Sequence, residues 1–152
     1  MDHTDRAAAL LEAVPVHRTF GLRVLEAADG RGRVDLDVAG PVTNVIGSLH
    51  SSGLITLVDA AGLAAIIGAA EAPEELDGLL PLGVVAELAF LAPARGTLVA
   101  TAVLEGDDLA SARAFLDGRE SRGALSTTAE VRDVDDAVVS RGRFDWKLRR
   151  RP

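Results

Sequence analysis

A single carboxylate lies in the middle of a long apolar stretch of this chain. From Leu54 to Ala70 every residue is apolar or glycine except Thr56 and Asp59. A helix of this composition is apolar around its whole circumference and is expected to be buried on nearly all sides. A carboxylate at its centre is costly to desolvate unless a partner pairs with it or the protein uses it. Because a poorly solvated carboxylate is a stronger base than one in water, Asp59 is the first candidate for chemistry.

A second group of polar residues precedes this apolar stretch. His50 lies nine residues before Asp59, and Ser51 and Ser52 follow it where the helix is expected to begin. Either serine could act as the N-cap of the helix. A helix N-terminus presents unpaired N–H groups and about half a positive charge, which suits a negative charge that develops on a substrate oxygen. The start of the helix is therefore the second candidate for chemistry.

Each candidate also has a structural alternative. Asp59 could be a buried acid that pairs with an arginine such as Arg95. His50 could be only a hydrogen-bonded residue at the start of a helix. Asn44 could shape the preceding loop through a local side-chain turn.

A serine-hydrolase triad of His50, Ser51 or Ser52, and Asp59 fails on both motif and spacing. A nucleophile elbow requires Gly-x-Ser-x-Gly, and the residue two positions before Ser51 is leucine. Nine residues of helix make about two and a half turns, which places the side chains of His50 and Asp59 on opposite faces and ~13 Å apart. If both residues act on one substrate, the site must be shared between two chains.

The sequence around the candidates predicts one α+β domain in which an antiparallel sheet covers one very apolar helix. The first expected element is a helix over Asp2–Val14, with Asp2 or Thr4 as its cap and Pro15 at its end. Two strands, over Leu22–Ala27 and Arg33–Val38, and a loop over Asn44–Ser52 lead into the long helix. After it we expect strands over Val84–Leu91 and Leu98–Leu104, a short helix over Leu109–Leu116 capped by Asp107 and Asp108, and strands over Ala124–Val131 and Val138–Leu148.

Alternation and small residues indicate how these elements pack. The residues expected to point inward are Val34, Leu36 and Val38 in the second strand and Phe144, Trp146 and Leu148 in the last. Glycines at positions 53, 62 and 68 of the long helix would each cost about 1 kcal/mol relative to alanine. Three such costs indicate that another backbone approaches the helix closely.

Composition excludes several classes of protein. The 152 residues suit one domain, with residues 1–19 as an N-terminal helix and lead-in, and the net charge of −7 argues against a general nucleic-acid binder. A chain without cysteine has no disulfide and no cysteine nucleophile. His3 and His17 lack the spacing of metal ligands, so we expect no metal site. We expect a cytoplasmic protein without membrane contact, because the N-terminus is not a signal peptide and the apolar stretch falls short of the ~20 residues that span a bilayer.

The spacing of the candidate residues resembles that of a known family. Asn44-x-x-Gly47-x-x-His50, followed by Asp59 inside an apolar helix, is similar to the pattern of the PaaI-type hotdog thioesterases. In that family the pattern is Asn-x-x-Gly-x-x-His-Gly-Gly followed by Leu-x-Asp. A second stretch, residues 89–96, is similar to the family's strand that ends in a proline turn. Together with the order of elements, the resemblance covers most of the chain.

The resemblance implies a hotdog fold, in which an antiparallel sheet wraps around one long buried helix. It also implies a homodimer or a dimer of dimers with active sites shared between chains, and hydrolysis of an acyl-coenzyme A (acyl-CoA) thioester without a cofactor. In such an enzyme Asp59 would be the nucleophile or general base, and the backbone N–H of Ser51 would polarise the thioester carbonyl. His50 and Asn44 would position that carbonyl or the water. The substrate site would also include Gly47, Ser52, Gly83 and Arg95.

The sequence departs from the family pattern at three points. Ser51-Ser52 replaces Gly-Gly, and Gly83 stands where some members carry a serine or threonine that holds the attacking water. Residues 107–119 resemble a helical insertion in a hairpin that the family usually keeps short. Two alternatives therefore remain beside a thioesterase. One is a non-catalytic hotdog domain that binds acyl-CoA or serves in assembly. The other is an acyl-thioester hydratase or dehydratase that uses His50 in a different arrangement.

Overall fold

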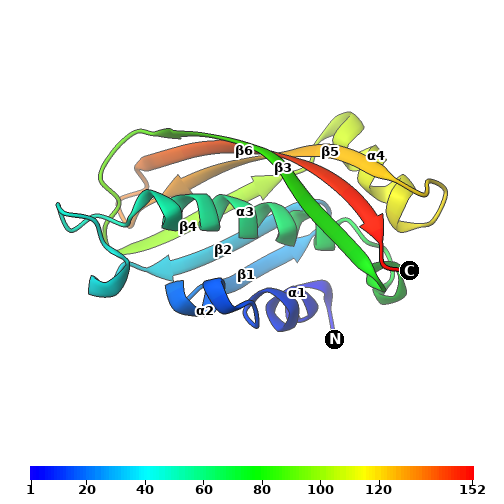
Figure 1. Cartoon of the computed structure of the whole chain (residues 1–152), viewed down its shortest axis with the longest axis horizontal. Helices are drawn as coiled ribbons and strands as arrows, with labels where there is room; N and C mark the ends of the chain where they lie inside the picture. Colours follow the sequence, from blue (N-terminus) through cyan, green and yellow to red (C-terminus); the bar gives the residue numbers. More distant parts are fainter.

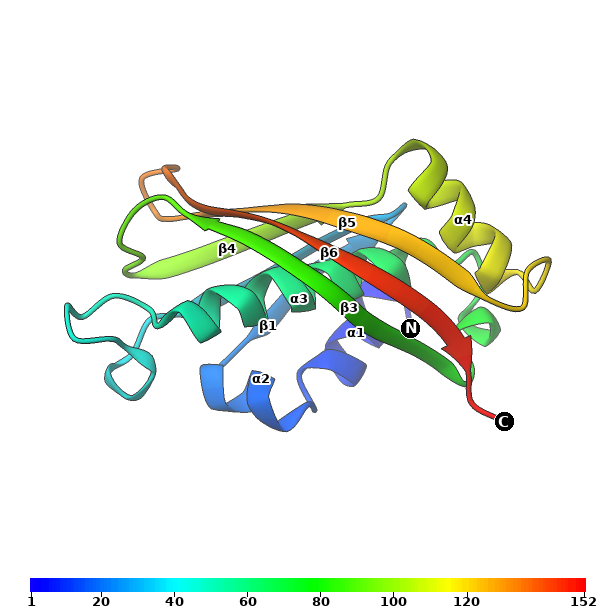
Figure 2. The same cartoon turned by 45° about the horizontal axis from the view of Figure 1, so that its top comes forward.

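A six-stranded antiparallel sheet forms the framework of the protein, and one long helix lies against its concave side (Figure 1). The computed structural model describes residues 1–152. The strands are β1 (Arg23–Ala28), β2 (Arg31–Asp37), β3 (Leu79–Phe90), β4 (Thr97–Val103), β5 (Gly123–Arg132) and β6 (Val138–Arg150), in the order β1-β2-β4-β5-β6-β3 across the sheet. The sheet curves around α3 (Ser51–Gly68), as Figure 2 shows from a second direction. The predicted α+β architecture is confirmed.

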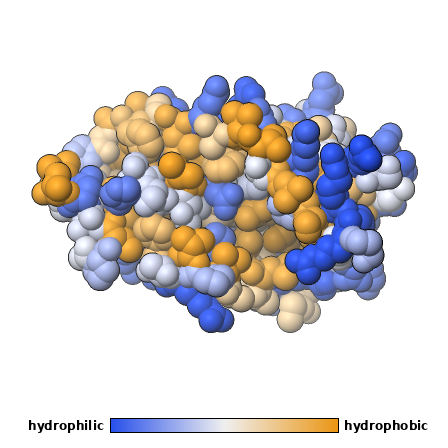
Figure 3. Space-filling model, viewed as in Figure 1, coloured by the Kyte–Doolittle hydropathy of each residue, from blue (hydrophilic) through white to orange (hydrophobic).

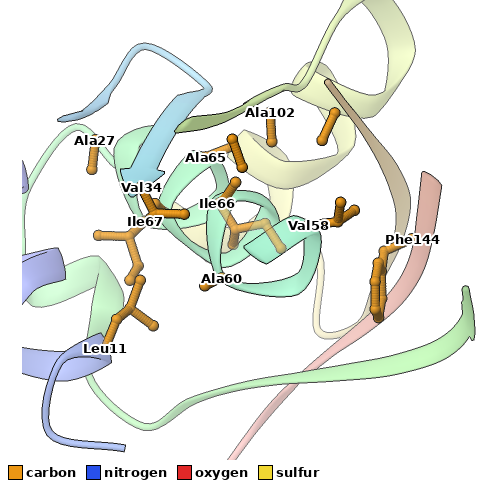
Figure 4. Packing of buried hydrophobic residues seen from close by; sticks show 14 of the residues in the cluster. Leu11, Ala27, Val34, Val58, Ala60, Ala65, Ile66, Ile67, Ala102 and Phe144 are labelled. Atoms are coloured by element: carbon orange, nitrogen blue, oxygen red, sulfur yellow. The ribbon is translucent and has the colours of Figure 1, made fainter. Parts of the chain in front are cut away.

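The hydrophobic core lies between α3 and the inner face of the sheet (Figure 4). Leu57, Val58 and Ile66 on the sheet side of α3 are fully buried. Most of the residues predicted to face inward are buried, namely Val34, Leu36, Phe144, Trp146 and Leu148. The exception is Val38, which lies just past the end of β2 and is half-buried. The alternation in the sequence therefore predicted the inner face of the sheet correctly.

Two backbones meet where α3 crosses β2. Gly32 of β2 lies so close to the helix that a Cβ atom there would overlap the helix backbone. Gly68, at the end of α3, lies equally close to the backbone of Ala28 in β1. The close approach predicted from the helix glycines is therefore correct for Gly68, whereas Gly53 and Gly62 make room for side chains.

Replacing Gly32 with alanine is expected to lower the free energy of unfolding by about 1–3 kcal/mol, the usual range for extra atoms forced into a packed core. The added methyl group would meet the carbonyl oxygen of Ala61, which belongs to the helix backbone and cannot rotate away. Gly40→Ala is the matched control, because a Cβ at Gly40 would meet no atom within 4 Å. Urea unfolding of both variants measures the difference. Equal stabilities would contradict the backbone contact between β2 and α3.

The N-terminal region forms two helices instead of the one that was predicted. The first helix, α1 (His3–Leu11), begins at its predicted N-cap, Asp2, whose side chain accepts a backbone hydrogen bond. The prediction that Pro15 ends this helix is wrong, because Pro15 is the first residue of α2 (Pro15–Phe20). Proline is common at this position, where its missing N–H would have no partner within the helix. The second helix brings His17 close to α3.

The edge strand β3 begins at Leu79, five residues before the predicted start at Val84. Pro81 and Gly83 are unusual inside a strand and obscured its first half in the sequence. Both are tolerated here for a structural reason. Proline is accepted on an edge strand, and Gly83 lies at an irregularity in the pairing with β6.

A short helix, α4 (Gly106–Leu116), lies between β4 and β5 as predicted, but its cap differs. Glu105 is the N-cap and makes no side-chain capping bond. Asp108 belongs to the first turn, and its Oδ1 accepts a hydrogen bond from the Ser126 N–H of β5 at 2.9 Å. The carboxylate therefore docks the helix onto the sheet instead of capping it.

One face of α3 is left partly uncovered, which corrects the prediction of burial on nearly all sides. Ser52, Ile55, Thr56, Asp59 and Leu63 recur at helical spacing and are exposed or half-buried; we call them the open stripe. Figure 3 shows this side of the molecule, with apolar side chains gathered over it. By length and composition α3 could cross a membrane, but 67% of it is buried inside this chain, as in the core helix of a globular protein.

Candidate active site

A histidine caps the N-terminus of α3. His50 is the N-cap, and its Nδ1 accepts a hydrogen bond from the backbone N–H of Ser52 at 3.1 Å. The same nitrogen lies 2.8 Å from Ser52 Oγ. The prediction that Ser51 or Ser52 caps the helix is therefore wrong, because an imidazole nitrogen takes the place of the serine oxygen. The side chain of His50 is otherwise exposed.

The first N–H of α3, that of Ser51, donates no hydrogen bond within the chain. Its neighbours are occupied. The Ser52 N–H donates to His50, and the Gly53 N–H donates to the His50 carbonyl oxygen at 2.8 Å. Ser51 therefore presents a free donor at the positive end of the helix dipole.

Asn44 shapes the loop that leads into α3. Its Oδ1 accepts hydrogen bonds from the N–H groups of Ile46 and Ser48, both at 3.1 Å. Gly47, at the turn of this loop, has a φ of 71°, which glycine adopts without strain. The side-chain carbonyl of Asn44 thus shapes the loop, as the structural alternative for this residue predicted. Its amide NH2 makes no hydrogen bond within the chain and remains able to donate.

A buried serine joins this loop to the proline turn after β3. Ser48 is 4% exposed, and its Oγ accepts from the Ala94 N–H at 2.7 Å and donates to the Ala94 carbonyl at 3.3 Å. The Leu49 N–H donates to the same carbonyl at 2.8 Å. Arg95 Nη2 donates to the Ile46 carbonyl at 2.9 Å. The two stretches that carry the family resemblance are therefore held together in space.

The loop, the N-terminus of α3 and the end of β3 line an open pocket of about 380 Å³. Its polar groups come from the loop and the helix start, and its apolar side chains come from the loop, from α3 and from β3 with the following turn. The lining residues are Asn44, Ile46, Ser48, Leu49, Ser51, Leu54, Phe90, Leu91, Ala92 and Pro93. An apolar wall with a few convergent polar groups is typical of small-molecule sites.

A larger hollow, of about 1,090 Å³, lies on the outer face of the sheet, opposite α3. Several of its charged groups pair with one another. Glu130 bridges Arg132 and Arg141, and both arginines hold the pKa of the Glu130 carboxyl below its usual value. Because Glu130, Arg132 and Arg141 are already engaged with one another, the smaller pocket at the start of α3 is the better candidate for chemistry.

Asp59 lies on the open stripe, outside the lining of the pocket. Its side chain is 31% exposed, and its Oδ2 is 3.9 Å from Nε2 of His17 on α2. The alternative in which Arg95 pairs with Asp59 is wrong, because Arg95 binds the loop carbonyl instead. The helix separates Asp59 from His50 by ~13 Å. One chain therefore does not bring these two candidates together.

The sequence reasoning missed His17 as a neighbour of Asp59. His17 is 2% exposed, and its Nδ1 lies 2.7 Å from the Leu11 carbonyl oxygen. Burial lowers the pKa of His17, but the Asp59 carboxylate and the Leu11 carbonyl raise it by more, so the pKa lies above the usual value. The sequence feature that could have indicated the position of His17 is Pro15. Proline favours the start of a helix, which places His17 within the first turn of that helix.

None of the other predicted substrate-binding residues lines the pocket. Gly47 forms the turn of the loop, Ser52 lies in the first turn of α3, and Arg95 supports the loop from the proline turn. Gly83 lies further along β3, where a Cβ would be 3.4 Å from the ring of Phe144.

Solved structures with the same architecture define the class of this fold. A Pseudomonas aeruginosa protein of unknown function, a probable thioesterase, is 23% identical, with 97% of this chain and 96% of that chain covered and a TM-score of 0.77. PaaI from the Escherichia coli phenylacetic acid degradation operon is 20% identical over 99% of this chain and 97% of its own, with a TM-score of 0.69. A Haemophilus influenzae thioesterase is 14% identical over 99% and 92%, with a TM-score of 0.72. The predicted hotdog fold, an antiparallel sheet wrapped around one long helix, is confirmed.

The family of the chain follows from its sequence. Residues 6–148 match the family described as a domain of unknown function, DUF4442, and the chain belongs to this family. The comparison with curated proteins gives no match. The family description names no activity.

Proposed function

We propose that this protein is a thioester hydrolase that converts an acyl-CoA and water into a free acid and coenzyme A. The observation that carries the proposal is the free N–H of Ser51, which lies at the N-terminus of α3 beside a pocket with an apolar wall. A backbone donor at the positive end of a helix stabilises the oxyanion that forms when a thioester carbonyl is attacked. The thioesterases among the similar structures support the same class.

In the proposed reaction the Ser51 N–H donates to the thioester carbonyl oxygen. The free amide of Asn44 and the exposed ring of His50 position that carbonyl or the attacking water. Asp59 takes a proton from the water as a general base, or attacks the carbonyl carbon itself and is then released by water. Either way one water is consumed, the C–S bond breaks, and the sulfur leaves with its electron pair and is protonated to the thiol.

The separation of His50 and Asp59 makes a second copy of the chain part of the proposal. β3 is an edge strand, and an edge strand with exposed apolar side chains is ready to pair with another chain. Its large exposed apolar residues are Leu82, Val84, Val85 and Phe90. A two-fold axis beside β3 would pair this strand antiparallel with β3 of a partner and bring the two open stripes together. His50 of one chain would then face Asp59 of the other, in a dimer or a dimer of dimers.

A panel of acyl-CoA thioesters with a thiol-detecting reagent tests the proposed activity. Release of free thiol supports hydrolysis. Loss of enoyl absorbance without thiol release would instead assign the hydratase or dehydratase reaction. Binding of acyl-CoA without turnover would assign a non-catalytic hotdog domain, the alternative that the side chains of Ser51 and Ser52 and the missing hydroxyl at Gly83 favour.

Two substitutions of Ser51 separate its backbone N–H from its hydroxyl. Ser51→Gly keeps the N–H, so we expect activity close to or above that of the wild type. Ser51→Pro deletes the N–H, and we expect a loss of ~3 kcal/mol of transition-state stabilisation, about 10²-fold in kcat.

The site suits this test, because Ser51 is the first residue of α3, where proline is favoured, and the ψ of 146° at His50 is compatible with a following proline. Steady-state kinetics and thermal unfolding of both variants give the answer. A folded Ser51→Pro protein with normal kcat would contradict the oxyanion role. A folded but inactive Ser51→Gly protein would assign the role to the hydroxyl.

A further inference from the structure

His17 and Asp59 form a pair that links two helices. His17 on α2 is 2% exposed, and its Nε2 lies 3.9 Å from Oδ2 of Asp59 on α3. Its other ring nitrogen, Nδ1, is 2.7 Å from the carbonyl oxygen of Leu11 at the end of α1. The imidazole is therefore held between a backbone carbonyl on one side and a carboxylate on the other.

These two contacts determine where the ring protons lie. A carbonyl oxygen can only accept, so Nδ1 carries the proton that it donates to Leu11. In a neutral ring Nε2 would then turn a lone pair toward the Asp59 carboxylate, and the two groups would repel. The contact becomes attractive when both nitrogens are protonated, so that an imidazolium faces Asp59.

We infer that His17 is a positioning residue for Asp59, whose carboxylate it holds, as an imidazolium, in the orientation that serves the reaction. This inference rests on the proposed function, because that function gives Asp59 its role. The separation of 3.9 Å is longer than a direct hydrogen bond, so the pair acts through charge or through one bridging water. Because His17 is buried and the Asp59 side chain is 31% exposed, the carboxylate is held from the protein side and reachable from the other.

The other charged groups around this pair are either engaged or exposed. Glu12, at the end of α1, turns toward β1, where its Oε1 accepts a backbone N–H at 2.8 Å. Arg18, the next residue of α2, is exposed, and Asp59 is the one charged residue of α3. The raised pKa of His17 agrees with these surroundings, since burial lowers it while the carboxylate and a backbone carbonyl raise it by more.

Two variants separate the hold on Asp59 from support of the fold. His17→Asn can keep an N–H near the Leu11 carbonyl but lacks the nitrogen that faces Asp59. His17→Gln can keep a neutral donor toward Asp59 but carries no charge. We expect His17→Asn to lower kcat by about 10-fold to 100-fold with KM nearly unchanged, the effect of a misplaced catalytic group. His17→Gln should recover part of this loss.

A double variant tests whether His17 acts through Asp59. In the background of Asp59→Asn, the change His17→Asn should cause no further loss of kcat, because the group that it positions is already gone. Independent effects would instead multiply.

The pKa of the His17 imidazole, measured by NMR, gives a readout that does not depend on activity. A raised pKa in the folded state means that the pair stabilises the fold below the unfolded-state pKa of about 6.5, and that this stabilisation is lost as the pH rises through the folded-state pKa. The difference in unfolding free energy between wild type and His17→Asn should therefore be larger at about pH 5.5 than at about pH 8.5. Asp59→Asn should lower the pKa of His17.

The outcomes separate this inference from the proposed function. An active wild type whose kcat is unchanged by His17→Asn would overturn the inference and leave the function standing. A pKa of His17 that does not respond to Asp59→Asn, or a double variant with a further loss of kcat, would also overturn it. A wild type that hydrolyses no thioester would overturn both.

Discussion

Replacing Asp59 with asparagine is expected to lower the turnover of acyl-CoA by at least ~10²-fold, in line with the loss of a general base. The substitution keeps the size of the side chain and removes its charge. The fold should tolerate it, because the side chain lies on the open stripe and is 31% exposed, and because no hydrogen bond from a backbone group depends on it. Steady-state kinetics with the best substrate of the panel, together with circular dichroism, measure the effect.

Asp107→Asn is the matched control for this change. It removes the same charge from an exposed position in the first turn of α4, where no catalytic role is proposed. Its turnover should match that of the wild type. Normal hydrolysis by Asp59→Asn would make the carboxylate a structural partner of His17 and would contradict the mechanism, as would a variant that fails to fold.

Mixed dimers are expected to regain activity that neither parent has. If His50 of one chain faces Asp59 of the other, dimers of His50→Ala alone, or of Asp59→Asn alone, carry a defect in both sites. In a mixed dimer both defects fall in one site, and the other site keeps its native His50 and Asp59. Random re-assortment of equal amounts makes about half the dimers mixed, so activity should recover to about a quarter of the wild-type value.

This recovery is measured by subunit exchange between the two inactive proteins, with a tag on one of them to quantify the mixed dimers. Each protein exchanged with itself is the control and should stay inactive. Confirmed mixed dimers without recovered activity would rule out a shared site. A protein that stays monomeric at assay concentrations would contradict the pairing through β3.

The elements with strong local patterns could be predicted from the sequence. The long helix follows from its apolar composition, and the inner face of β6 from the alternation of Phe144, Trp146 and Leu148. The start of β3 could not be predicted in this way. Pro81 and Gly83 argue against a strand in general, and only the position of β3 at the edge of the sheet makes them acceptable.

The candidate site shows the same division. The spacing of Asn44, His50 and Asp59 was visible in the sequence, and so was the helix start that presents the Ser51 N–H. The helix cap could not be predicted from the sequence, because serine is the better N-cap by propensity. Only the folded loop brings the His50 ring back over the start of the helix. The neighbour of Asp59 was not visible either, because residues so far apart in the chain meet only through tertiary packing.

The backbone contact between β2 and α3 bears on how substrate preference can diverge in this fold. Gly32 lies directly against the helix backbone, so no tunnel runs beneath α3 at this crossing. In the proposed enzyme, an acyl tail that enters at the helix N-terminus therefore does not pass between α3 and β2 at Gly32, whereas the open stripe past Ile55, between the two chains, offers it a path. Tail-length preference can thus change at positions that lie between the two chains of the proposed dimer and outside the hydrophobic core of each chain.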